Sequence, residues 1–166
     1  MNTSWITPLL LNPLSTSPPS IGFGTIPQQQ SMQTTTTQTN SNYKAGAREF
    51  VDRYSSASFF SLTCIDPHYA PDSLISLTLF KGGQGEAFEF RGPVPFREKM
   101  ASLNASSIKY SDLTITAQPF GNQSALISVH GKAEINYTLY PISCTFMIKV
   151  IDSTPKIAHQ ILEVFM

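Results

Sequence analysis

The sequence predicts an α+β fold in which two to three helices pack on one face of an antiparallel sheet. Two segments, around Tyr54 and around Met100, carry apolar side chains at the spacing of an amphipathic helix. From Ser107 to Phe165, apolar and polar side chains instead alternate with a period of two, which is typical of strands. Helices that precede and interrupt a run of strands favour packing as a layer on one sheet face.

Residues 1–42 differ in composition from the rest of the chain. They contain no Lys, Arg, Asp or Glu and are rich in Ser, Thr, Gln and Pro. Such a segment buries too little apolar area to offset the entropy lost on ordering, so we expect 1–42 to be a disordered tail and 43–166 to be the folded domain. Inside the tail lies a short apolar cluster, which is either an inert terminal stretch or a docking motif; it consists of Trp5, Ile6, Leu9, Leu10 and Leu11.

The domain should begin with an amphipathic helix over residues 43–57. Lys44 and Arg48 lie on its polar side, and a short second helix or apolar turn should follow before Pro67 and Pro71 end it. The apolar positions of the first helix recur at helical spacing and are Tyr43, Ala47, Phe50, Val51 and Tyr54.

A hairpin and a second helix should come next. Residues 74–80 have the composition of a strand, and residues 87–91 form a short alternating strand. The glycine-rich KGGQGE between the two strands predicts a hairpin turn. A phosphate-binding loop is disfavoured, because the segment lacks the Lys-Ser/Thr ending and the following helix of such a loop. The second helix is predicted over residues 94–103 from the spacing of Phe96, Met100 and Leu103.

The remaining chain reads as four strands: LTITAQP, SALISVHGKAEIN, TFMIKV and KIAHQILEVF. In the second of them, Ala125, Ile127 and Val129 share one face, and Leu126 and its alternate neighbours share the other. The side chains expected to face the helices in the last two strands are Phe146, Ile148, Val150, Ala158, Leu162 and Val164, with Gln160 joining them.

The balance of charges, the N-terminal stretch and the two cysteines argue against several classes of function. Eleven basic and eleven acidic residues give a formal net charge of zero, which argues against broad electrostatic binding of nucleic acid. The N-terminal apolar stretch is too short to span a bilayer and lacks the basic start of a signal peptide, so no membrane role is expected. Cys64 and Cys144 form no CxxC pair; reduced thiols are favoured, and a disulfide between them stays open.

No set of catalytic side chains stands out, so we predict a non-enzymatic protein without metal or cofactor. His68 and Asp66 could form an acid–base pair only if they met inside a cavity, and a polar loop is the favoured interpretation. A dense aromatic set serves as core, as a pocket for a partner's aromatic side chain, or as both; its members are Phe59, Phe60, Tyr69, Phe88, Phe90 and Phe96.

The order of these segments resembles the nuclear transport factor 2-like family. The resemblance covers residues 43–166 and is carried by REFVDRY, HYAPDS, FEFRG, the helix ending MASL, the pair Gln118 and Pro119, GKAEIN and the closing KIAHQILEVF. It implies a curved sheet folded into a cone, helices that close its wide end, and pairing of domains through the open sheet face. The last strand looks most like that of the small subunit of the messenger-RNA export receptor.

The resemblance also implies alternatives. Family members that carry Ran-GDP have two aspartates flanking one residue after the GKA-like strand, whereas this chain has Glu134, Ile135 and Asn136 there. Other members are enzymes, of isomerase or dehydratase type, that use the cone as an active site. A small cone-fold enzyme and a homodimeric Ran-GDP carrier are therefore the two alternative interpretations.

The favoured interpretation is a nucleocytoplasmic transport adaptor, a messenger-RNA export cofactor found in nucleus and cytoplasm and at the nuclear pore. It would heterodimerise with a larger export-receptor subunit that has a related domain, and help to bind phenylalanine-glycine nucleoporins. The expected partner-binding residues alternate along the outward face of the last strands and are Lys132, Glu134, Asn136, Thr145, Met147, Lys149, His159, Ile161 and Glu163.

Overall fold

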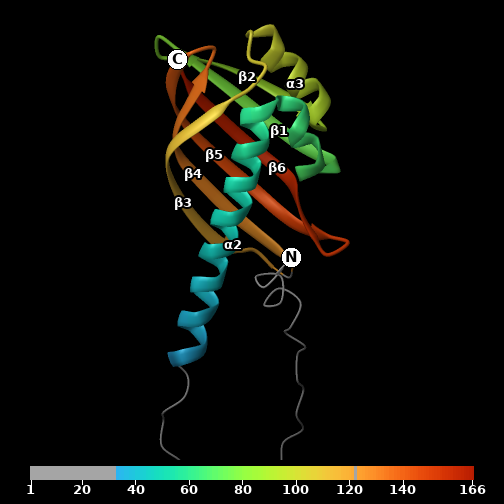
Figure 1. Cartoon of the computed structure of the whole chain (residues 1–166), viewed down its shortest axis with the longest axis vertical. Helices are drawn as coiled ribbons and strands as arrows, with labels where there is room; N and C mark the ends of the chain where they lie inside the picture. Colours follow the sequence, from blue (N-terminus) through green and yellow to red (C-terminus); the bar gives the residue numbers. More distant parts are fainter. Residues whose placement is uncertain (1–32, 122) are drawn as a thin grey trace, which may run out of the picture.

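The computed structural model of the chain describes residues 33–121 and 123–166. One long helix, a short 3-10 helix and a second α-helix accompany a sheet of six strands (Figure 1). The predicted tail falls mostly outside the described residues. In chain order the elements are α2 Gln33–Phe60, η1 Leu62–His68, β1 Tyr69–Lys81, β2 Gln84–Arg91, α3 Pro93–Ser102, β3 Lys109–Pro119, β4 Ser124–Ile135, β5 Thr138–Ile151 and β6 Thr154–Phe165.

The sheet has the strand order β2-β1-β6-β5-β4-β3, and every neighbouring pair is antiparallel except β1 and β6. It is therefore a mixed sheet, whereas the sequence predicted an antiparallel one. After the β1–β2 hairpin, α3 carries the chain to the far edge at β3, and the meander from β3 to β6 returns to lie beside β1. This return fixes the direction of β6 as parallel to β1.

Helix α2 crosses one face of the sheet, and its N-terminal part projects beyond the sheet (Figure 1). The apolar positions predicted for this helix, from Tyr43 to Tyr54, are all buried. The helix starts at Gln33 rather than near Tyr43, where the sequence predicted its beginning. Extending a formed helix costs much less than nucleating one, so polar residues next to a packed helix can continue it.

Helix α3 and the 3-10 helix cover the β1–β2 end of the sheet. Gly92 precedes α3 with φ of 78°, and a proline stands at the start of the helix, where its missing N–H costs nothing. Phe96 and Met100, both on α3, are fully buried between this helix and the sheet. Arg97 holds this helix to η1 through two hydrogen bonds to the Asp66 carboxylate, of 2.8 and 2.9 Å.

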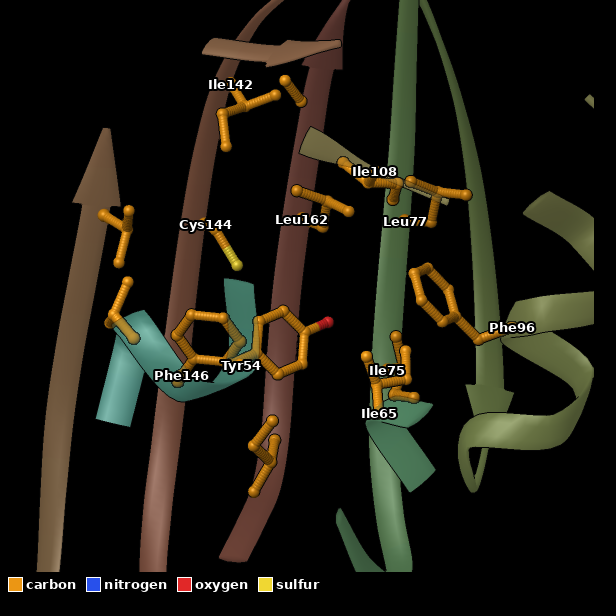
Figure 2. Packing of buried hydrophobic residues seen from close by; sticks show 14 of the residues in the cluster. Tyr54, Ile65, Ile75, Leu77, Phe96, Ile108, Ile142, Cys144, Phe146 and Leu162 are labelled. Atoms are coloured by element: carbon orange, nitrogen blue, oxygen red, sulfur yellow. The ribbon is translucent and has the colours of Figure 1, made fainter. Parts of the chain in front are cut away.

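The core lies between α2, α3 and the face of the sheet that they cover (Figure 2). The predicted inner positions of β5 and β6 are buried or half-buried, and Gln160 is among them. One detail differs, because Ile157 is also buried and pairs with Ile148, while Met147 pairs with His159. Ala158, which lies between Ile157 and His159, is therefore the extra residue of a β-bulge.

Gly131 of β4 provides a test of this packing. It lies opposite an irregular part of β3, and a Cβ atom placed on it would lie 2.8 Å from the Ser111 carbonyl oxygen and 3.0 Å from that of Asp112. Because backbone atoms cannot step aside, we expect Gly131→Ala to lower the free energy of unfolding by about 1–3 kcal/mol in chemical denaturation. Gly85→Ala is the control: its close neighbour is the Phe80 side chain, and a smaller loss is expected. Equal losses of stability in the two variants would contradict the close approach of the β3 backbone to Gly131.

Candidate functional site

The sheet face opposite α2, called the outer face below, carries side chains in rows that run across the strands. One row passes from Leu74 through His159 and Met147 to Leu126, as the pairing of β1, β6, β5 and β4 dictates. The next row contains Ile161 among Ser and Thr side chains. The outer face therefore has an apolar centre in polar surroundings.

These rows line a groove of about 490 Å³, called the outer groove below. Ile161 is 51% exposed and Leu74 is 40% exposed, so the apolar centre is open to solvent. Charged and polar side chains of β1, β2, β5 and β6 surround it. The side chains that project from the outer face into the groove are apolar Leu74, Leu126, Met147 and Ile161 and polar Ser76, Glu89, Arg91, Thr145 and His159.

The structure brings four of the nine predicted partner-binding residues together. Thr145, Met147, His159 and Ile161 all line the outer groove. Their role in binding stays a prediction, but the alternation that selected them places them on one continuous surface.

The other five predicted residues do not line the groove. Lys132 pairs with Asp112 at 2.8 Å, and Glu134 lies 3.7 Å from the Lys109 amine. Asn136 belongs to the β4–β5 turn and not to a strand face. The remaining two, which line none of the groove, are Lys149 and Glu163.

Sequence reasoning missed five of the groove residues, which are Leu74, Ser76, Glu89, Arg91 and Leu126. A signal for Leu74 was present, because LISLTLF alternates and Ile75, Leu77 and Leu79 are the buried members. The alternation says which face Leu74 occupies, but it does not say that β1 lies beside β6. The neighbourhood of the site therefore required the strand order.

The covered face contains a hydrogen-bonded cluster, called the tyrosine cluster below, which consists of Tyr54, Tyr69, Gln160 and Cys144. The two tyrosine hydroxyls are 2.9 Å apart, and the Tyr69 hydroxyl donates to the Gln160 side-chain oxygen. The Gln160 amide nitrogen donates to the Tyr54 hydroxyl at 3.4 Å and to the Cys144 sulfur at 3.5 Å. Figure 2 shows Tyr54 against Phe146, close to Cys144.

Burial keeps the tyrosine cluster uncharged. It raises the pKa of Tyr54 and Tyr69, and it raises the pKa of the Cys144 thiol to about 12. A thiol with so high a pKa is a poor nucleophile at neutral pH. The space left beside Tyr54, Cys144 and Phe146 is about 10 Å³, room for about one water molecule.

His68 and Asp66 do not form a pair. Asp66 is bound by Arg97, and the half-buried His68 ring packs edge-on against Phe50 and Tyr54, at centroid distances of 6.1 and 5.9 Å. Burial lowers the His68 pKa, and the nearby Lys156 and Arg53 lower it further. His68 is therefore a neutral packing side chain at the end of η1, whereas the sequence predicted a polar loop here.

Four of the six predicted aromatic side chains belong to the core or its edge, and a pocket for a partner's aromatic side chain stays a prediction. Tyr69 and Phe96 are buried in the core, and Phe88 and Phe90 pack on its edge. At the end of α2, Phe59 and Phe60 are exposed.

Metal-ligand groups, membrane-spanning helices and thiols can be assessed in the part of the chain that the structure describes. Within residues 33–121 and 123–166, no three His, Cys, Asp or Glu side chains are grouped as a metal site needs. No helix in the same ranges is long and apolar enough to cross a bilayer. Cys64 is exposed and Cys144 is buried, and both are free thiols.

Comparison with known proteins adds evidence at the level of structure. No protein-family model matches the sequence, and no curated protein matches it. Nuclear transport factor 2 from Cryptosporidium parvum is similar in structure, with a TM-score of 0.60 and 20% identity over 75% of this chain and 96% of that chain.

Two further structures represent other functions. The complex of the yeast deubiquitinase Ubp3 and the Bre5 cofactor has a matching chain with a TM-score of 0.53 and 17% identity, over 73% of this chain and 95% of that one. A candidate scytalone dehydratase from Novosphingobium aromaticivorans matches with a TM-score of 0.57 and 13% identity, over 78% of this chain and 89% of the other. At these identities the likeness concerns the fold, and the chain has the nuclear transport factor 2-like fold.

Proposed function

We propose that this protein is a binding adaptor that pairs through its outer groove with a domain of another polypeptide. The observation that carries the proposal is the solvent-exposed apolar row at the centre of the outer face, rimmed by charged and polar side chains. An apolar centre with a polar rim is the usual anatomy of a protein interface. The charges on the rim, Glu89 and Arg91, have opposite signs and favour a specific partner over a uniformly charged one.

The free volumes of the interior and of the outer groove support binding at the surface over catalysis in the interior. The interior beside the tyrosine cluster has about 10 Å³ free, whereas the outer groove has about 490 Å³. Two neighbours with this fold support a role in assembly: one is a nuclear transport factor, and the other is a complex of a deubiquitinase with a cofactor. We extend the proposal to nucleocytoplasmic transport, with a larger messenger-RNA export receptor subunit as the partner and phenylalanine-glycine nucleoporins as the ligands of the pair.

Ile161→Lys tests the proposal. The residue is 51% exposed, so in the free chain the new amine can reach solvent and the fold should survive. A lysine in the apolar centre of an interface must be buried without a counter-charge or must hold the partner away. We expect the variant to lose a stoichiometric larger partner that the wild-type chain co-purifies from cells, through a reduction in affinity of about 100-fold.

The control is Thr116→Lys. Thr116 lies in the same row of the outer face as Ile161 but on the edge strand β3, outside the groove. It adds the same charge to the same face and should retain the partner. Retention of the partner by both variants would place the interface elsewhere, and absence of any stoichiometric partner from the wild-type preparation would overturn the adaptor function.

A further inference from the structure

The outer groove exposes apolar side chains to solvent, and the chain itself carries a short apolar segment N-terminal to α2. The apolar cluster of the N-terminal segment lies outside the described residues and contains Trp5, Ile6 and three leucines. We propose that this segment, residues 5–11, docks in the outer groove of its own domain. The inference concerns the same surface as the proposed function, but it stands or falls on a separate measurement.

The position of the groove makes the docking geometrically accessible. Met147 is near the end of β5, and Leu126 is near the start of β4, so the groove is close to the end of the sheet that carries the β5–β6 turn. Helix α2 begins beyond this same end (Figure 1). Residues 12–32 could span up to about 70 Å if extended, while the whole of α2 is about 42 Å long. The groove lies on the face opposite α2, so the connection has to pass around this end of the sheet, and when extended it is longer than the whole of α2.

The chemistry of the segment fits the groove. Residues 1–42 have no charged side chain, so the segment meets neither repulsion nor an unpaired charge at a rim that contains both Glu89 and Arg91. Its indole and branched side chains match an apolar centre of Leu74, Met147 and Ile161. The rim also offers hydrogen-bonding groups to the indole N–H and to the peptide groups of the segment.

Tethering decides between this occupant and an external one. A segment joined to its own binding site is presented to it at about millimolar concentration. An intrinsic dissociation constant of about 1 mM, which the burial of two large apolar side chains can supply, is therefore enough for substantial occupancy. A second copy or an external partner at micromolar concentration needs a correspondingly higher affinity to take the groove.

The experiment uses the fact that Trp5 is the single tryptophan of the chain. Selective excitation of tryptophan in the purified full chain reports on this residue alone. We expect an emission maximum at shorter wavelength than that of free N-acetyl-tryptophanamide, and an acrylamide quenching constant several-fold lower, both independent of protein concentration. Ile161→Lys should shift the emission to that of exposed indole and restore quenching, whereas Thr116→Lys should leave both unchanged.

Each other outcome overturns the proposal. Emission of exposed indole in the wild-type chain would mean that the groove is empty. Protection that appears only as concentration rises would assign the groove to a second copy of the chain. Protection that persists in Ile161→Lys would place Trp5 elsewhere. None of these results depends on co-purification of a partner, so a failure here is distinguishable from a failure of the adaptor function.

Discussion

Gln160→Glu should destabilise the protein by about 3 kcal/mol near neutral pH and by much less near pH 4. Gln160 is 1% exposed and lies inside the tyrosine cluster. The substitution keeps the shape of the side chain and replaces an amide with a group that can ionise. At neutral pH the protein must either bury a carboxylate without a cation or hold it protonated, and both alternatives cost free energy.

The direction of the pH dependence follows from burial. Desolvation raises the pKa of the new carboxyl in the folded state above its unfolded value of about 4.3. The neutral form can still accept from the Tyr69 hydroxyl and donate to that of Tyr54. The stability of the variant relative to wild type is therefore present below about pH 4.3 and is lost as the pH rises through the folded pKa. Each pKa unit of this rise corresponds to about 1.4 kcal/mol of lost stability.

Denaturant unfolding of both proteins between about pH 4 and pH 7.5 measures this difference, and Gln118→Glu is the matched control. Gln118 lies on β3 and is exposed, so the same substitution there should change stability by less than about 0.5 kcal/mol. A pH-independent loss in Gln160→Glu would show that the cluster is wet, and that its hydrogen bonds are not formed in a dry core.

Periodicity predicted most of the elements because each side chain's face is a local property. The spacing from Tyr43 to Tyr54 predicted the buried face of α2, and alternation predicted the buried faces of β4, β5 and β6. Alternation also identified Gln160 as an inward polar side chain. Its partners could not be predicted, because Tyr54 and Tyr69 lie far from it in sequence.

The features that failed to emerge from the sequence depend on long-range contacts. The groove needs β1 beside β6, and that neighbourhood follows from the path of the chain through α3 and around the sheet. The bulge at Ala158 depends on the register with β5. Arg97 and Asp66 carry no local pattern, and they meet only because α3 packs on η1. In each case the sequence shows the type of the residue but does not predict which distant residue lies beside it.

Phe146→Ala should cost about 3–5 kcal/mol of stability, whereas Met147→Ala should cost about 1 kcal/mol or less. These neighbours on β5 point to opposite faces of the sheet. Phe146 is 3% exposed and packs edge-on against Tyr54 and Phe50, at centroid distances of 5.1 and 6.0 Å. Its removal leaves a cavity between α2 and the sheet, while Met147 lines the open outer groove.

The same pair separates folding from binding. Denaturant unfolding followed by far-ultraviolet circular dichroism should show the large loss only for Phe146→Ala. In co-purification, Met147→Ala should lose partner although it is stably folded, because the substitution removes part of the apolar centre that the partner covers. If Met147→Ala proved as destabilising as Phe146→Ala, the side chain would be part of a packed core. The outer face would then be an interior surface of the folded chain, and both the groove and the adaptor function that depends on it would have to be abandoned.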